Sequence, residues 1–263
     1  MSNEPTMIKS IIRAMFHPVA VRMGYVFPAR SGPPVKPAPQ PVSPTLVDKF
    51  YDVLAKSGFE PVHIMDVGAN HGHYTRKARS KFPKARITMI EPQGWLQPSF
   101  QDLLDNDPLI QFFPVGAGRR RGSFQFTIAK RDDSSTFRLS PEEAKARGLE
   151  QKEIPVVTLN ELVTENGLPV PDLVKIDAEG LDLEVLEGAS DFFGRTEVFM
   201  VEAGVVNKMF ANSVLDMVKY MDDKGYRLVD ITDLNRPFDV PVLWLVELAF
   251  VRKGGVVDSR TWL

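Results

Sequence analysis

From residue 45 to residue 224, short apolar runs alternate with segments of helical spacing, and this order leaves few folds open. The apolar runs that predict strands are 62–67, 86–91, 110–115, 123–128, 172–177 and 197–202. The segments that predict helices are 45–57, 72–82, 95–104, 158–166, 181–187 and 212–224. Such alternation predicts an α/β fold built on a mostly parallel, doubly wound sheet.

The last two predicted strands, 226–231 and 243–251, are separated by a loop that contains Pro237 and Pro241 and no helix pattern. Strands joined without a crossover helix pair antiparallel, so we expect a C-terminal hairpin. Between the central strands, the sequence predicts a short helix from Pro141 and an edge strand over 154–158.

The first 44 residues differ from the rest. They hold five basic residues against one acidic residue, and apolar positions at helical spacing over 7–16. Seven prolines follow within 28–44, which predicts an extended spacer. We therefore divide the chain into a basic arm, 1–44, and a main domain, 45–263. The favoured interpretation is that the arm's helix packs on its own domain or on a partner subunit, as in a homo-oligomer. The alternative is docking on an anionic membrane surface.

Composition excludes several classes of function. The chain has no cysteine, so disulfides, cysteine–metal sites and thiol catalysis are excluded. Lys and Arg total 32 against 34 Asp and Glu, a balance that does not favour a nucleic-acid partner. No uncharged apolar stretch reaches the roughly 18 residues of a membrane span. No export signal is visible, and we expect a cytoplasmic protein.

A glycine-rich turn, Asp66-Val67-Gly68-Ala69-Asn70-His71-Gly72, follows the first core strand and opens a helix. Gly68 and Gly72 allow close approach to a ligand, and free N–H groups at the helix start favour a carboxylate. Asp66 is placed to hold an ammonium group. Glu91 ends the next strand, where an acid accepts both ribose hydroxyls. Together they predict an adenosine-containing ligand; the alternative is a tight turn beside a surface carboxylate. Neither the G-x-G-x-x-G fingerprint nor a phosphate loop fits.

Five sequence blocks resemble the FkbM family of S-adenosylmethionine-dependent O-methyltransferases. They are DVGANHGHYT at 66–75, IEP at 90–92, VGAG at 115–118, the serine pair at 134–135 and VKIDAEGLDLEVLEGA at 174–189. The resemblance covers about 60–252. It implies a class I methyltransferase sheet of seven strands, the last antiparallel, and S-adenosylmethionine as cofactor.

The resemblance, with the turn, assigns a set of donor-binding residues: Asp66, Gly68, Asn70, Gly72, Tyr74, Thr75, Glu91, Pro92, Gly116, Ala117, Ser135 and Asp177. The chain departs from the family at His71, often apolar or aromatic there, and at Leu181-Asp182, often Ala-Glu. Both positions vary, so the departures concern the substrate.

Three carboxylates are the candidate catalytic residues. Asp177 and Glu179 follow a central strand, and the resemblance implies that their block lines the methyl-donor and acceptor pocket. Asp177 is the first candidate for general base or acceptor positioning, and Glu179 the second; in the alternative, Asp177 caps the next helix. Glu202 ends the following strand and is expected to contact acceptor hydroxyls. We predict no metal site: His71 and His73 have no third ligand at convincing spacing.

The sequence therefore predicts an O-methyltransferase acting on a hydroxyl of a small molecule, with a sugar, glycan or secondary metabolite favoured by the resemblance. The alternative is a non-catalytic module that binds an adenosine ligand or a partner on the same fold. A nicotinamide-linked oxidoreductase is disfavoured by the glycine spacing and the C-terminal hairpin.

Overall fold

The computed structural model describes residues 44–130, 135–206, 212–236 and 242–260. Apart from Pro44, the predicted N-terminal arm lies outside the described residues, as does Ser134 of the serine pair. None of the helices in the described ranges is long and apolar enough to cross a membrane.

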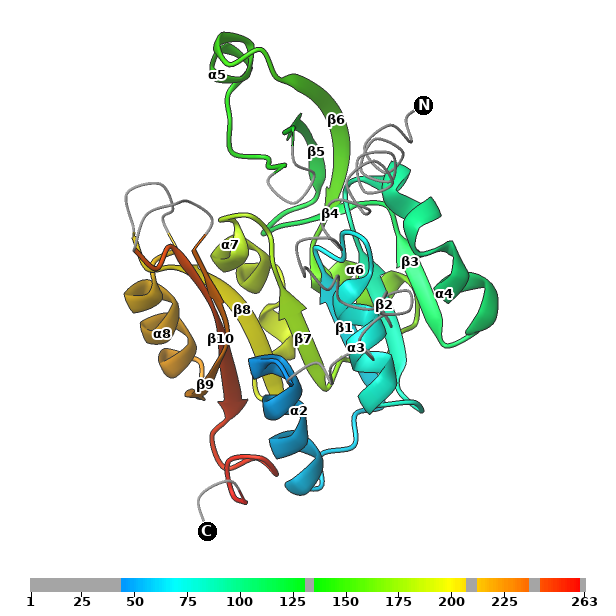
Figure 1. Cartoon of the computed structure of the whole chain (residues 1–263), viewed down its shortest axis with the longest axis vertical. Helices are drawn as coiled ribbons and strands as arrows, with labels where there is room; N and C mark the ends of the chain where they lie inside the picture. The colour runs from blue at the N-terminus through cyan, green and yellow to red at the C-terminus, as the bar shows by residue number, and fades with distance from the viewer. Residues whose placement is uncertain (1–43, 131–134, 207–211, 237–241, 261–263) are drawn as a thin grey trace, which may run out of the picture. The chain divides into compact units, whose positions relative to one another are not determined.

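A seven-stranded sheet forms the centre of the domain (Figure 1), in the order β3-β2-β1-β7-β8-β10-β9. Its strands are β1 (His63–Val67), β2 (Arg86–Ile90), β3 (Ile110–Phe113), β7 (Leu173–Ile176), β8 (Val198–Gly204), β9 (Tyr226–Asn235) and β10 (Leu245–Arg252). β10 pairs antiparallel with both β8 and β9, and the pairs among β3, β2, β1, β7 and β8 are parallel. The predicted α/β sheet and its C-terminal hairpin are confirmed.

The strand order reverses between β1 and β7. From β1 the chain winds outward through β2 and β3, and then it returns to place β7 on the other side of β1. In an open α/β sheet, ligands bind beyond the carboxyl ends of the strands at such a reversal. A ligand-binding site is therefore expected at the loops that follow β1 and β7.

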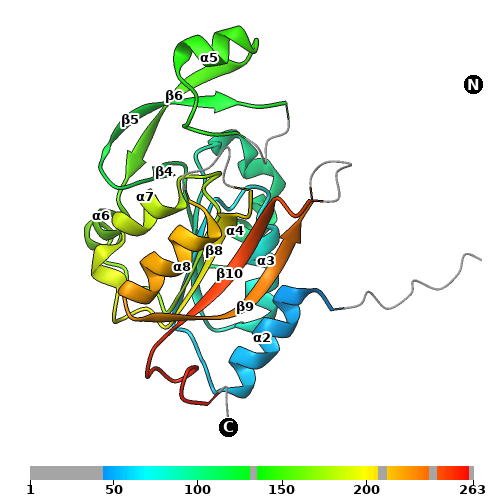
Figure 2. The same ribbon diagram turned by 90° about the vertical axis from the view of Figure 1, so that its left-hand side faces the viewer.

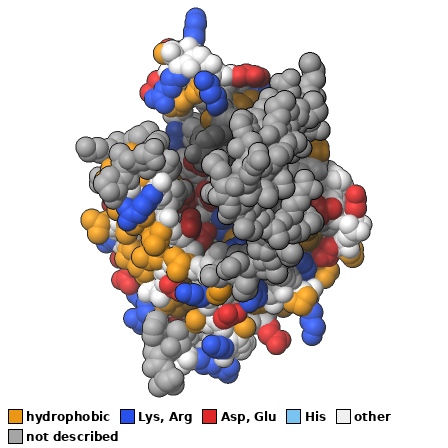
Figure 3. All heavy atoms as spheres, in the orientation of Figure 1, with side chains coloured by type: hydrophobic (Ala, Val, Ile, Leu, Met, Phe, Trp, Pro, Cys, Tyr) orange, Lys and Arg blue, Asp and Glu red, His pale blue; other side chains and the backbone are white. Residues whose placement is uncertain are grey.

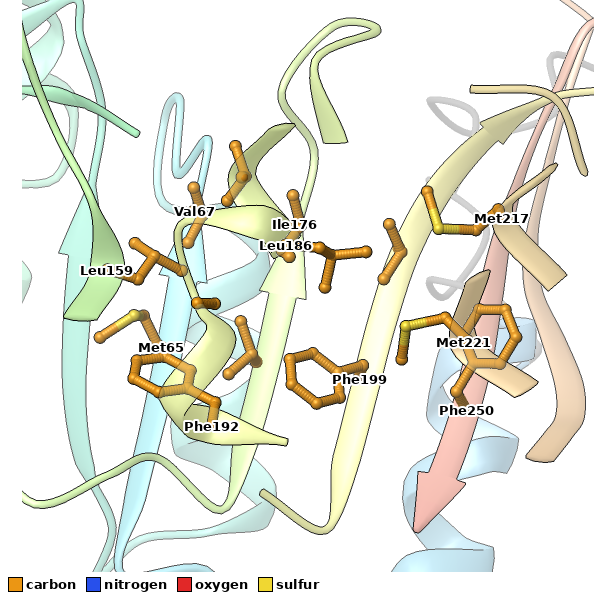
Figure 4. Packing of buried hydrophobic residues seen from close by; sticks show 14 of the residues in the cluster. Met65, Val67, Leu159, Ile176, Leu186, Phe192, Phe199, Met217, Met221 and Phe250 are labelled. Atoms are coloured by element: carbon orange, nitrogen blue, oxygen red, sulfur yellow. The ribbon is translucent and has the colours of Figure 1, made fainter. Parts of the chain in front are cut away.

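Helices cover both faces of the sheet (Figures 1 and 2). One face packs against α2 (Leu46–Lys56), α3 (His73–Lys81) and α4 (Gln101–Asn106). The other packs against α6 (Leu159–Glu165), α7 (Asp182–Glu187) and α8 (Val214–Asp223). Figure 4 shows this second core, where Ile176 and Phe199 from the strands meet Leu186, Met217 and Met221 from the helices. Alternate residues of each buried strand thus supply two cores.

The helix predicted over 95–104 divides into two pieces. A 3₁₀ segment, η1 (Gly94–Ser99), contains Pro98, and α4 begins only at Gln101. Proline has no N–H to donate and its ring clashes with the preceding turn, so a continuous α-helix through this position is disfavoured.

A second, three-stranded sheet was not predicted. It consists of β4 (Gly116–Ala117), β6 (Glu150–Val157) and β5 (Gly122–Ile128), in that order, with α5 (Pro141–Ala146) beside it. Figures 1 and 2 show this auxiliary sheet beyond the carboxyl ends of the main strands. The predicted edge strand 154–158 was wrong in extent and place. β6 is the middle strand, and its first residues are polar and mostly exposed, so they carry no apolar signal.

Candidate active site

A cavity of about 870 Å³ lies between the carboxyl ends of the main strands and the auxiliary sheet. This volume is near the upper end of the range for small-molecule sites, about 300–1,000 Å³. Residues at or just beyond the carboxyl ends of β1, β2, β7 and β8 form its inner wall, and residues 135–139 with α5 and the turn after it form its outer wall. Figure 3 shows acidic side chains near the centre of this face of the molecule.

The glycine turn brings the two central loops into contact. Gly68 has φ +78°, and a Cβ at this position would overlap the carbonyl oxygen of Asp177. The turn is fixed to β2 as well, because the N–H groups of Gly68 and Ala69 donate to the carbonyl of Ile90 at 2.9 and 3.0 Å. Only glycine permits this approach at the point where the strand order reverses.

Glu91 is buried at the end of β2 and lines the cavity. One carboxylate oxygen accepts from the N–H of Asn70 and the other from the N–H of Gln93, both at 2.9 Å. Burial raises the pKa of Glu91, while these two hydrogen bonds oppose the increase. The carboxylate is thus held in the cavity wall by two backbone donors, and the side chain of Gln93 also lowers its pKa.

The predicted donor-binding residues fall into two groups. Those that line the cavity are Gly68, Asn70, Glu91, Pro92, Gly116, Ala117, Ser135 and Asp177. Those outside its lining are Asp66, Gly72, Tyr74 and Thr75. Members of the second group contact the core: the Thr75 hydroxyl donates to Asp66 at 2.6 Å, and the Tyr74 hydroxyl donates to the sulfur of Met200 at 3.3 Å. Direct donor contact by any of these residues stays a prediction.

Sequence reasoning missed Lys175, which is buried on β7. Its ammonium nitrogen lies 2.9 Å from Oδ2 of Asp177 and 5.7 Å from the centre of the Tyr74 ring. Burial acts to lower the pKa of Lys175, but the carboxylates of Asp177, Asp66 and Glu247 outweigh it and raise the pKa. One ammonium group therefore balances carboxylates from β1, β10 and the loop after β7. The signal was the position itself, a lysine within an otherwise apolar central strand.

The three candidate catalytic carboxylates, Asp177, Glu179 and Glu202, all line the cavity. Glu179 has φ +50°, an uncommon conformation for a residue with a side chain. Glu202 lies opposite Glu247 of β10, and burial together with the charge of Asp177 raises its pKa well above the ordinary value. The structure therefore brings together three carboxylates that the sequence placed at the ends of two separate strands.

Asp182 holds the loop that carries Asp177 and Glu179. It is fully buried and accepts from the N–H groups of Ala178 at 2.9 Å and Gly180 at 3.2 Å, on either side of Glu179. The side-chain amide of Asn212 also donates to Asp182, at 2.7 Å. The alternative in which Asp177 caps the helix was wrong: α7 has no side-chain cap, and Asp177 pairs with Lys175 instead.

The rings of His71 and His73 lie 6.1 Å apart at the start of α3. Within the ranges that the structure describes, no group of three or more His, Asp or Glu side chains is arranged to hold a metal ion.

The strand order, the glycine turn and the acid at the end of β2 together define a class I methyltransferase architecture. Sequence comparison agrees: the family model described as the methyltransferase FkbM domain matches residues 66–228. The chain belongs to the FkbM methyltransferase family, as its motifs predicted.

Two kinds of relative resemble the chain more distantly. Methyltransferase 1 of Beauveria bassiana (strain ARSEF 2860) is 25% identical over 162 residues, which cover 55% of this chain and 64% of that protein. The Burkholderia thailandensis 1,6-didemethyltoxoflavin-N1-methyltransferase, solved with 1,6-didemethyltoxoflavin and S-adenosylhomocysteine, has a TM-score of 0.45 and 11% identity, covering 96% of this chain and 92% of that one. A precorrin-6y C5,15-methyltransferase from Geobacter metallireducens GS-15 has a TM-score of 0.42 and 13% identity, covering 78% and 88%.

Replacing Lys175 with methionine is expected to cost about 3–5 kcal/mol of unfolding free energy at pH 7.5, because it leaves buried carboxylates without their cation. Urea denaturation measures the loss. The loss should shrink as the pH falls, because burial raises the pKa of Asp66 and of Glu247, and protonation removes their uncompensated charge. Lys219→Met is the control, because Lys219 forms an exposed pair with Asp223 and its removal should change stability little. An equal loss in both variants would contradict the structural role of Lys175.

Asp182 predicts a specific pH dependence of stability. Burial raises its pKa from 3.8 to about 7, so the folded chain retains a proton that the unfolded chain loses at lower pH. Its contribution to stability is therefore full below about pH 4 and declines as the pH rises through 7. Thermal unfolding from pH 5 to pH 8 should show a shallower decline for Asp182→Asn than for the natural protein. Exposed Asp105→Asn should keep the natural slope, and so a natural slope in Asp182→Asn would refute the assignment.

Proposed function

We propose that this protein transfers a methyl group from S-adenosylmethionine to a hydroxyl oxygen of a small molecule rich in hydroxyls, such as a sugar, a glycan or a related secondary metabolite. The observation that carries the proposal is one cavity lined by two sets of carboxylates. Glu91 follows β2, Asp177 and Glu179 follow β7, and Glu202 lies on β8. The first set suits a ribose, and the second suits an acceptor.

The residues on the donor side fit S-adenosylmethionine. Glu91 offers two oxygens already held by backbone N–H groups, which suits a pair of adjacent hydroxyls. Gly68 lines the cavity, and because it has no side chain the loop after β1 can lie directly against the Asp177 carbonyl. Bound there, S-adenosylmethionine supplies a methyl group on a positively charged sulfur. The carboxylates of Asp177 and Glu179 favour that positive charge because they lie on the same cavity wall.

The acceptor side is polar with one broad apolar surface. Besides the three carboxylates, Asp233, Asn235 and Trp244 line this part of the cavity. Carboxylate and amide oxygens accept hydrogen bonds from hydroxyl groups, and an indole ring offers a flat face for packing. Such a wall suits a molecule that carries several hydroxyls on a compact frame.

Catalysis in this arrangement depends mainly on position. The wall holds the acceptor oxygen in line with the transferred methyl, and alignment of that kind lowers the barrier substantially. Asp177 is the proposed base, because its carboxylate faces the cavity and Lys175 fixes one of its oxygens. Glu202, whose pKa burial raises, is suited to donate a hydrogen bond to a neighbouring acceptor oxygen.

The donor site is tested by thermal unfolding with and without S-adenosylhomocysteine. A ligand at one hundred times its dissociation constant stabilises the folded state by about 2.7 kcal/mol. Glu91→Gln should weaken binding at least tenfold, because an amide cannot accept at both positions that the carboxylate occupies. Glu60→Gln, at an exposed position, should bind as the natural protein does. No stabilisation of the natural protein at millimolar ligand would refute the donor assignment.

The catalytic assignment is tested with methyl-labelled S-adenosylmethionine and a panel of hydroxyl compounds that includes hexoses, uronic acids and hexose phosphates. Asp177→Asn should lower kcat at least a hundredfold while S-adenosylhomocysteine affinity changes by only a few fold. Asp230→Asn is the control, because Asp230 lies on β9 outside the cavity lining. Equal turnover by Asp177→Asn would exclude Asp177 as the base. Ligand binding with no methylated product would instead favour the non-catalytic module.

A further inference from the structure

The outer wall of the cavity differs in charge from the inner wall. Arg138 and Arg147 both line the cavity from the outer wall, and both are largely exposed to solvent. The inner wall carries the carboxylates of Asp177, Glu179 and Glu202. In Figure 3, basic side chains are visible at the top of this face and acidic ones near its centre. The inner wall of the cavity is therefore acidic, and its outer wall carries basic side chains.

Backbone contacts fix the segment that carries Arg138. Thr127 of β5 and Thr136 exchange backbone hydrogen bonds of 2.8 and 3.1 Å. On the other side of Arg138, the side chain of Gln151 donates to the carbonyl of Leu139 at 3.0 Å. The arginine thus extends from a backbone held at both ends, which reduces the ordering that ligand binding would require.

Arg147 follows α5, where its N–H donates to the carbonyls of Glu143 and Ala144 at 3.1 Å. Glu143 is an acidic side chain of the outer wall, and it is engaged in a capping box. A carboxylate oxygen of Glu143 accepts from the N–H of Ser140 at 2.8 Å, and this hydrogen bond is the main cause of its lowered pKa. Glu143 also attracts Arg147, so among the described residues the outer wall holds two guanidinium groups and one carboxylate.

Guanidinium groups at the mouth of a cavity attract ligands of opposite charge. Their planar donors match the oxygens of a phosphate or a carboxylate, often with two parallel hydrogen bonds. The positively charged sulfur of the donor is repelled by them and is favoured by the acidic floor. An acceptor with a negative group at one end and a hydroxyl at the other would match both walls.

We propose that the acceptor carries an oxyanion, either a phosphate or a carboxylate, which Arg138 and Arg147 bind while its reacting hydroxyl faces Asp177. This inference rests on the proposed function and narrows its class of acceptor from polyols in general to anionic polyols.

The test measures binding by calorimetry to protein saturated with S-adenosylhomocysteine. The probes are glucose, glucose 6-phosphate and glucuronate, so the two sources of negative charge are compared with a neutral sugar. At least one anionic probe should bind tenfold or more tightly than glucose. Arg147→Gln and Arg138→Gln should each remove most of that difference, and Arg147→Lys should remove only part of it. Lys145→Gln is the matched control, because Lys145 lies on α5 outside the cavity lining.

Three results would overturn the inference. One is equal affinity for glucose and both anionic probes, and another is an equal effect of Lys145→Gln. The third is a loss of S-adenosylhomocysteine affinity in the arginine variants, which would assign the arginines to the donor's own carboxylate. Failure of the natural protein to bind S-adenosylhomocysteine at all would refute the proposed function itself, and the thermal measurement separates that case from the other three.

Discussion

The buried ammonium group of Lys175 is the interaction on which the site depends. Asp66 and Asp177 lie at and just beyond the ends of neighbouring strands, and Glu247 approaches from the antiparallel strand β10. Without a cation between them, these carboxylates would repel one another in a region with little water. Lys175 therefore allows a concentrated acidic floor to exist inside a stable sheet.

The order of strands and helices was predictable because each buried strand is a short apolar run that a glycine or a proline ends. The hairpin was predictable for a different reason: no helix pattern separates 226–231 from 243–251. The auxiliary sheet was not predictable in this way. Its middle strand begins with Glu150-Gln151-Lys152-Glu153, and these polar residues leave no periodic signal. The 3₁₀ segment was missed for another reason. The apolar spacing over 95–104 predicts one continuous helix, but Pro98 disfavours a continuous α-helix there.

The sequence predicted the acidic residues of the candidate site better than it predicted the residues that hold them in place. Strand-end acids such as Glu91, Asp177 and Glu202 are visible in the sequence because they interrupt apolar runs at one edge of a sheet. The partners that hold them are not visible, since hydrogen bonds between distant residues leave no local pattern. In the sequence, Asp182 stood out only as a departure from the family pattern that concerns the substrate, yet it holds the loop on both sides of Glu179. The outer wall depends on tertiary packing for the same reason.

The auxiliary sheet joins the main fold through two chain connections, one after β3 and one before α6. Residues can be added to or removed from this part without changing the order of the seven main strands. The residues of the inner wall and those of the outer wall can therefore change independently in evolution. An engineer who wishes to redirect such a protein can replace residues within 118–157, keep Ser135 with the other predicted donor residues, and leave the rest of the chain as it is.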